Sequence, residues 1–127
     1  MTTRLLFIVT ALSEAGLGLV LVLAPSVPVS LLIGALIDTA GGLVVARVAG
    51  AALLSIGLAC WLARGEGPSR AERGLVAALL LYNTVVVALL VHARIDSGLS
   101  GVGLWPAVGL HTALAGWCAA CLHRAKI

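Results

Sequence analysis

Charged and aromatic residues are scarce in this chain of 127 residues: 10% of the sequence is Asp, Glu, Lys or Arg, and 4% is Phe, Trp or Tyr. A soluble domain of this length needs polar side chains to cover its surface, so the low charge content excludes that class. The few aromatics, beside 15 glycines, indicate helices that approach closely through small residues. The sequence also lacks a glycosylation sequon, a lipidation signal and an internal repeat, and nothing in it indicates a second domain.

Apolar residues are correspondingly abundant, at 61% of the sequence, with a mean hydropathy of +1.17. They are concentrated in four stretches, each long enough to cross the hydrocarbon core of a bilayer as a helix. These predicted spans cover residues 5–23, 43–62, 75–91 and 105–122. We therefore expect an all-α fold, a four-transmembrane-helix bundle that forms a single domain over residues 1–127 and faces lipid on its outside.

The first span follows Arg4 and is followed by Ala24, an order that is also found in secretory signal peptides. The apolar run is longer than a usual signal-peptide core, it contains Glu14, and Pro25 directly follows the candidate cleavage position. These features predict a retained helix.

The positive charges are distributed unevenly along the sequence. If the chain crosses four times, six basic residues fall on one side: Arg4, Arg64, Arg70, Arg73, Arg124 and Lys126. The other side holds Asp38 and the Arg94/Asp96 pair. The positive-inside rule then places both termini in the cytoplasm. The net charge of +3 is thus a topology signal, and it indicates no nucleic-acid partner.

Two connections between the spans carry local signals. Pro25 and Pro28 end the first span, and residues 29–37 are apolar but too short to cross a bilayer. We expect a short interfacial helix or a re-entrant segment there, serving as a lid or as a plain hydrophobic connector over the bundle. Ser69 and Glu72 have the spacing of a capping box, which predicts the start of the third long helix.

All four spans carry polar or ionisable residues, among them Glu14, Arg47, Asn83 and His111, one from each span. A charged side chain at bilayer depth costs about 2.5–3.5 kcal/mol on the gentlest scale, so these residues are expected in the bundle interior. At about 1.5 Å per residue, Glu14 and Asn83 form a central layer, and Arg47 and His111 a layer nearer the outer surface. A direct Glu14–Arg47 ion pair and a gap filled by water, ligand or Asn83 both remain open.

This polar set allows two interpretations. The four residues can form a satisfied network that fixes the register of the helices. Alternatively, they line a cavity, open toward the outer leaflet, for a small amphipathic ligand with a quinone- or lipid-like head group. In that case Arg47 binds the head group, and Glu14 or His111 handles a proton. We expect the protein to form a homo-oligomer or to bind a partner membrane subunit, and the sequence implies no cofactor.

Two other function classes fit the same residues. One is proton-coupled transport of a small solute, with Glu14 as the proton carrier. The other is a non-catalytic accessory or assembly subunit that docks through faces of small residues, namely Ala51, Ser55, Ala59, Thr112 and Gly116. No nucleophile–base or metal-ligand spacing favours an enzyme.

Cys118 and Cys121 form a C-x-x-C pair, as in four-helix membrane thiol oxidoreductases that use a quinone. The pair lies near the C-terminal end of its helix and on the reducing side of the membrane, which favours a packing role for these thiols and for Cys60. Haem binding by His92 and His111 is disfavoured, because the two residues differ in depth and lie on consecutive helices.

Several motifs resemble those of short four-helix membrane proteins of bacteria, of the DoxX-like kind. They are Leu-Ile-Gly-Ala-Leu-Ile-Asp-Thr-Ala-Gly-Gly at residues 32–42, Ala-Arg-Val-Ala-Gly-Ala at 46–51, Tyr82-Asn83, and Trp-Pro-Ala-Val-Gly-Leu-His at 105–111. The resemblance covers most of the chain, implies a multi-pass protein of the bacterial inner membrane, and supplies no defined activity.

A second resemblance is to the small multidrug resistance transporters. The chain is similar to them in its length, its lone Glu14 in the first helix, and Gly109 and Gly116 in the fourth. Arg47 and the strong charge bias depart from that family, because the bias fixes a single orientation in the membrane.

Overall fold

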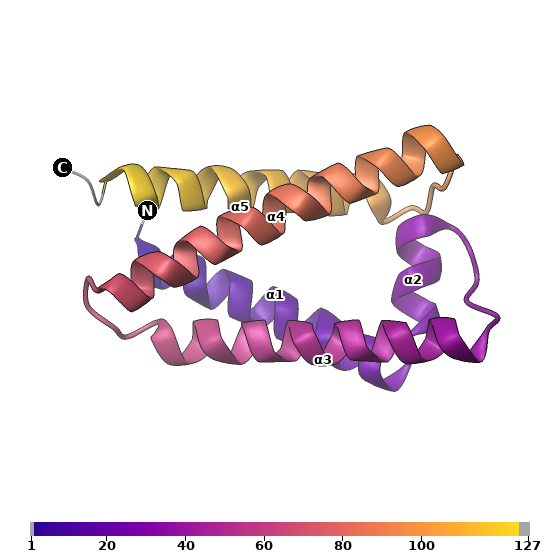
Figure 1. Cartoon of the computed structure of the whole chain (residues 1–127), viewed down its shortest axis with the longest axis horizontal. Coiled ribbons are helices and arrows are strands. Elements are labelled where there is room, and N and C mark those ends of the chain that lie inside the picture. Colours follow the sequence, from indigo (N-terminus) through magenta and orange to yellow (C-terminus); the bar gives the residue numbers. More distant parts are fainter. Residues whose placement is uncertain (1, 125–127) are drawn as a thin grey trace.

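The computed structural model describes residues 2–124, and within this range the chain forms five α-helices and no strand. In chain order these are α1 (Thr3–Leu23), α2 (Ser26–Ile33), α3 (Ala40–Ala63), α4 (Arg70–Ser97) and α5 (Leu104–Arg124). The four long helices form one bundle in which each is antiparallel to the long helix before it, and the short α2 lies across one end (Figure 1). The predicted all-α class is confirmed.

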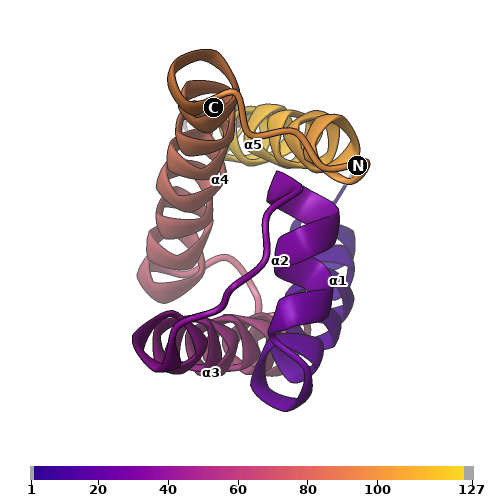
Figure 2. The same ribbon diagram turned by 90° about the vertical axis from the view of Figure 1, so that its right-hand side faces the viewer.

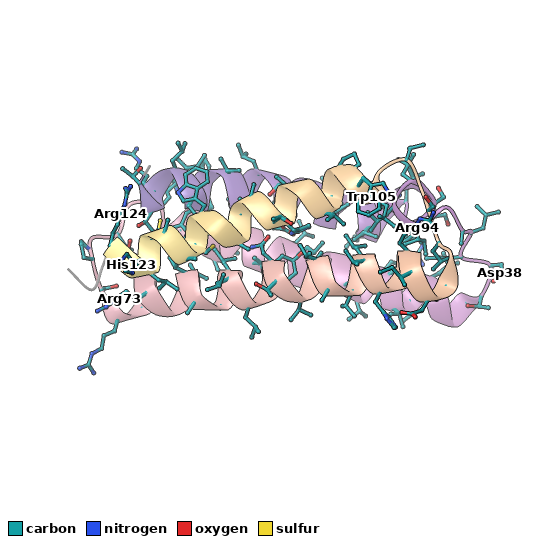
Figure 3. The ribbon with its side chains drawn as sticks, turned by 90° about the horizontal axis from the view of Figure 1, so that it is seen from above. Asp38, Arg73, Arg94, Trp105, His123 and Arg124 are labelled. Carbon is teal, nitrogen blue, oxygen red and sulfur yellow. The ribbon has the colours of Figure 1, made fainter. Side chains whose placement is uncertain are left out.

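The two ends of the bundle differ in charge. The start of α1, the α3–α4 connection and the end of α5 lie together at one end, which we call the basic end (Figure 1). Its arginines are Arg4, Arg64, Arg70, Arg73 and Arg124. Figure 3 shows Arg73 and Arg124 at this end, and Asp38 and Arg94 at the opposite, α2 end. Lys126, which the sequence places with the arginines, lies outside the described residues.

Three helices, α1, α3 and α4, are long and apolar enough to cross a membrane. Helix α5 is as long as α1, at 21 residues, but it is not among the three. Much of the bundle's outer surface is apolar, with Leu12 65%, Val45 69% and Leu81 67% exposed. Water disfavours such a surface and lipid does not, so the helices and the surface together indicate a membrane protein.

Local signals account for where the helices begin and end. The Ser69 side chain accepts a hydrogen bond of 3.0 Å from the backbone N–H of Glu72, as the capping pattern predicts. Helix α2 begins three residues before the predicted segment, at Ser26, because Pro28 lies in its first turn, where the missing N–H has no helical partner. It ends at Ile33, and Gly34 caps it with a φ of 72°, the left-handed conformation that glycine adopts without strain.

Backbones approach most closely within two antiparallel pairs, α1 with α3 and α4 with α5. In the first pair Gly18 faces Gly50. A Cβ at Gly18 would lie 2.7 Å from the Gly50 carbonyl oxygen, and a Cβ at Gly50 would lie 2.7 Å from the Gly18 carbonyl oxygen. Close contact through small residues is the usual way in which membrane helices associate without a hydrophobic driving force.

Side chains from both pairs meet in the half of the bundle nearer the basic end. The buried apolar residues there are Leu6, Phe7, Ala11, Cys60, Val76, Leu79, Leu114 and Cys118. Next to this core, on its α2 side, lie the buried polar residues Glu14, Asn83 and His111, and beyond them apolar residues are buried again, among them Leu21, Leu90 and Leu104. The apolar core therefore joins the two helix pairs, and it borders the buried polar side chains on the side of the basic end.

The short helix α2 is fastened across its end of the bundle (Figure 2). The last carbonyls of a helix have no partner within the helix. Here the Leu31 carbonyl accepts a hydrogen bond of 2.8 Å from the N–H of Gly103, and the Leu32 carbonyl one of 3.3 Å from the N–H of Gly101. The α4–α5 connection thus holds α2 in place.

Substitution of Gly101 by Ala is expected to detach this end of α2. A Cβ at Gly101 would overlap the Leu31 carbonyl group, which is backbone and cannot rotate away. The loss of stability should be about 1–3 kcal/mol, and hydrogen exchange in Ser26–Ile33 should rise in a mass-spectrometric measurement. Gly65→Ala is the control, since no atom lies within 4 Å of a Cβ there. Unchanged exchange in Gly101→Ala would show that α2 is not fastened in this way.

Candidate functional site

A buried carboxyl group lies in the middle of α1. Glu14 is 2% exposed, and its Oε2 accepts a hydrogen bond of 2.9 Å from the hydroxyl of Tyr82 on α4. This bond crosses from one helix pair to the other. The chain has five Asp and Glu residues in all, and Glu14 is the one whose side chain is buried.

The neighbouring residue on α4, Asn83, connects the same region to α5. Its side-chain amide donates to the Leu79 carbonyl at 2.7 Å, which leaves its Oδ1 as an acceptor. His111 Nδ1 lies 2.7 Å from that oxygen, so Nδ1 carries a proton and donates it. In a neutral imidazole, Nε2 is then an acceptor.

The two bonds belong to one group of side chains. The rings of Tyr82 and His111 meet edge to face, with centroids 5.7 Å apart and an interplanar angle of 81°. We call Glu14, Tyr82, Asn83 and His111 the polar cluster. Three helices, α1, α4 and α5, contribute to it, and it lies at the junction of the two helix pairs.

The predicted division into two polar layers is wrong for His111. Counted from the basic end at about 1.5 Å per residue, Glu14 lies about 17 Å along its helix, and Asn83 and His111 both about 20 Å. The sequence estimate assumed that all four spans end at the same two planes. In the structure α4 extends to Ser97 at the α2 end, whereas the start of α5 at Leu104 lies nearer the basic end than the end of α4 does. His111 therefore lies at the same height along the bundle as Asn83, to which it bonds.

Arg47 does not belong to the polar cluster, although it was predicted from the sequence to line the same candidate cavity. Its side chain is exposed, and its Nε donates to the Val22 carbonyl at 3.3 Å. Side chains on α3 lean toward the start of the helix, which is at the α2 end, so a long side chain reaches away from Glu14. The guanidinium satisfies one of the last carbonyls of α1, and no ion pair joins Glu14 and Arg47 within the described residues.

Several polar atoms of this region have no partner among residues 2–124. They are Glu14 Oε1, His111 Nε2 and Thr10 Oγ1. Thr10 is fully buried one helical turn before Glu14, on the same face of α1. Of these three atoms, Thr10 Oγ1 is fully buried, and an unsatisfied buried polar group costs about 1–3 kcal/mol. Glu14 Oε1 and His111 Nε2 have free hydrogen-bonding capacity beside it, so the region can supply hydrogen bonds to a bound molecule.

Two of these residues were not predicted as site residues from the sequence. Tyr82 stands beside Asn83 in the sequence, and a lone tyrosine in a long apolar helix is itself an available signal, because a buried phenol needs a partner. Thr10 has the helical spacing of four from Glu14. In helices, the threonine hydroxyl usually bonds to a carbonyl of its own helix, as those of Thr84 and Thr112 do here. The sequence therefore gave no sign that the hydroxyl of Thr10 would be without a partner.

The remaining titratable residues lie elsewhere. His92 is exposed on α4 and pairs with Asp96 four residues later, so it is separate from His111, and the structure assembles no haem pair from them. Cys60 and Cys118 are fully buried in the apolar core, and Cys121 is half-buried near the basic end. All three are free thiols.

The polar cluster therefore offers one carboxyl group, one imidazole, one phenol and one amide in an otherwise apolar bundle.

Comparison of the chain with protein-family models, with curated proteins and with solved structures finds no match.

Proposed function

We propose that this protein is a four-helix integral membrane protein whose polar cluster binds the head group of a small amphipathic molecule, such as a quinone or a lipid. The observation that carries the proposal is the set of unpaired polar atoms in the cluster region, on Glu14, His111 and Thr10. A head group with both a hydroxyl and a carbonyl group complements them, because His111 Nε2 accepts and the Thr10 hydroxyl donates.

Glu14 gives the site its proton chemistry in this proposal. A carboxyl group that had Arg47 as its partner would lose an ion pair whenever it took up a proton. Here the partner is the Tyr82 hydroxyl, and no cation lies against Glu14 within the described residues. Glu14 can therefore exchange a proton with a bound molecule without breaking an ion pair.

The placement in the membrane is part of the same proposal. We place α1, α3, α4 and α5 across a bacterial cytoplasmic membrane, with the basic end and both termini inside. The gathering of five arginines at one end of the bundle supports this orientation. The apolar surface of α5, where Leu110 is 43% exposed and Trp105 58%, supports its contact with lipid.

Native mass spectrometry of the protein released gently from its own membranes tests the proposal, together with extraction and identification of small molecules from the same sample. We expect a defined molecule with a quinone- or lipid-like head group. It should be lost in Glu14→Gln and retained in the matched control Asp38→Asn, which makes the same change at an exposed carboxyl. Arg47→Ala should also retain it, because Arg47 lies outside the cluster.

Two results would count against this function. One is a protein that carries no small molecule under these conditions. The other is a molecule that stays bound in both Glu14→Gln and His111→Leu while these variants remain folded. In either case the polar cluster would serve only to fix the register of the helices.

A second candidate is proton-coupled transport of a small solute, and one observation favours it. The Glu14–Tyr82 hydrogen bond joins two helix pairs whose backbones otherwise lie apart, so a relative movement of the pairs would break it. This function predicts release of protons when substrate is added, which Glu14→Gln abolishes. Simple binding of a ligand predicts no net proton movement across the membrane.

The protein can also act as part of a larger assembly. The faces of small residues that the sequence suggests for docking are exposed: Ala51, Ser55 and Ala59 on α3, and Thr112 and Gly116 on α5. The hydroxyls of Ser55 and Thr112 bond to carbonyls of their own helices, so these faces are compatible with lipid or with another helix. A homo-oligomer or a partner subunit would appear as a larger mass in the same native spectrum.

A further inference from the structure

The basic end contains a hollow that is separate from the polar cluster. Its volume is about 450 Å³, and it lies between the start of α1, the start of α4 and the end of α5. Three arginines line it: Arg70, Arg73 and Arg124. Glu72 lines it as well and is the one acidic residue in the lining.

Two of these arginines have unused hydrogen-bonding capacity. The guanidinium groups of Arg70 and Arg124 form no hydrogen bond or ion pair with any described residue. Arg64, at the same end, differs from them. Its guanidinium lies 3.8 Å from the centre of the Trp61 ring and donates to the Trp61 carbonyl. The hollow therefore has two guanidinium groups, those of Arg70 and Arg124, available for an anion, whereas that of Arg64 is already engaged.

An apolar groove continues from this hollow along the bundle. Its volume is about 520 Å³, and it runs over α5 from Arg124 to Leu110, with Val9 of α1 at its edge. Cys121 and Arg124 line both the hollow and the groove, so the two adjoin at these residues. At about 1.5 Å per residue the groove is about 21 Å long, which exceeds half of a hydrocarbon core of about 30 Å.

We infer that an anionic phospholipid of the leaflet at the basic end binds here, with its phosphate in the hollow and one acyl chain along the α5 groove. A free phosphate would use the hollow and leave the groove without an occupant. A lipid uses both, since its charged head and its chain are joined at the point where Cys121 and Arg124 lie. Arginines between transmembrane helices on the cytoplasmic side are a recurrent mode of anionic-lipid binding.

Glu72 narrows the choice of head group. Its carboxylate repels a phosphate that approaches closely, but it accepts hydrogen bonds from hydroxyl groups. A head group that combines a phosphate with free hydroxyls, as in phosphatidylglycerol, can satisfy the arginines and Glu72 together. A phosphatidylcholine head group has no hydroxyl donor and no net negative charge.

The test uses the full chain in detergent, with dioleoyl phosphatidylglycerol, dioleoyl phosphatidylcholine and inorganic phosphate as probes, and native mass spectrometry as the readout. We expect phosphatidylglycerol to be retained in preference to phosphatidylcholine. Arg70→Gln combined with Arg124→Gln should weaken its binding by about thirtyfold, given roughly 1 kcal/mol for each basic residue at a lipid surface. Inorganic phosphate should not displace the lipid.

The matched control removes the same charge from the same end. Arg4→Gln combined with Arg64→Gln alters two arginines that do not line the hollow. Equal weakening in the control pair would reduce the effect to general surface charge and overturn the inference. Displacement of the lipid by inorganic phosphate would assign the hollow to a soluble anion and would equally overturn it.

A second pair of variants tests the acyl chain alone. Gly116 lines the groove, and no atom lies within 4 Å of a Cβ placed on it, so Gly116→Leu fills the groove without a backbone clash. We expect it to weaken phosphatidylglycerol binding several-fold. Gly109→Leu, on the same helix and equally unobstructed but outside the groove lining, should leave binding unchanged. Equal affinities in the two variants would mean that no chain occupies the groove.

Discussion

Gly50→Val is expected to separate α1 from α3 and to destabilise the bundle by about 3 kcal/mol or more. A Cβ at Gly50 would lie 2.7 Å from the Gly18 carbonyl oxygen and 3.0 Å from the Val22 backbone nitrogen. Both are backbone atoms of α1, so the contact is relieved only if the helices move apart. Since membrane helices associate mainly through such close packing, the whole pair should loosen.

Unfolding in increasing SDS, followed by the fluorescence of the three tryptophans, measures this loss. Gly16→Val is the control on α1. It makes the same substitution in a helix, but no atom lies within 4 Å of a Cβ at Gly16. If the two variants lost the same stability, the effect would come from helix propensity or backbone entropy. The close approach of α1 and α3 would then make no particular contribution to the stability of the bundle.

Tyr82→Phe should cost about 1–2 kcal/mol when Glu14 is present and almost nothing in a Glu14→Leu background. The phenol hydroxyl is the one hydrogen-bond donor that reaches the Glu14 carboxyl group within the described residues. Removing it leaves a buried carboxyl without a partner at the junction of the two helix pairs. With Leu at position 14 no such group remains, so the hydroxyl has little to contribute.

The same SDS titration applied to the four members of this double-mutant cycle gives the coupling energy directly. Thr84→Val is the matched loss of a hydroxyl on α4, because the Thr84 hydroxyl bonds to a carbonyl of its own helix. We expect Thr84→Val to be nearly neutral. Equal costs for Tyr82→Phe with and without Glu14 would show that the bond does not hold the helix pairs together.

The sequence predicted several parts of the site from the cost of burying polar groups. Glu14 and Asn83 are both buried and lie at similar heights, as estimated from the helical rise. His111 is buried as well. Each of these predictions needs only the position of a residue along its own helix and the free-energy cost of exposing its polar side chain to lipid.

Other features depend on how the helices are placed beside one another, which the rise per residue does not contain. His111 bonds to Asn83 because α4 and α5 are offset along the bundle axis. Arg47 was expected to line the cavity, yet its long side chain extends toward the α2 end, where its Nε donates to the Val22 carbonyl near the end of α1. The Gly18–Gly50 contact likewise requires the rotation of each helix about its axis, which a uniformly apolar sequence leaves undefined.

The most direct measurement is an infrared difference spectrum of the protein before and after addition of a short-chain ubiquinone analogue. If the polar cluster binds the head group, the carboxyl stretching region should change. The change should be absent in Glu14→Gln and present in Asp38→Asn. An analogue that binds without any change in the carboxyl region, or that leaves the same change in Glu14→Gln, would contradict a binding site at Glu14.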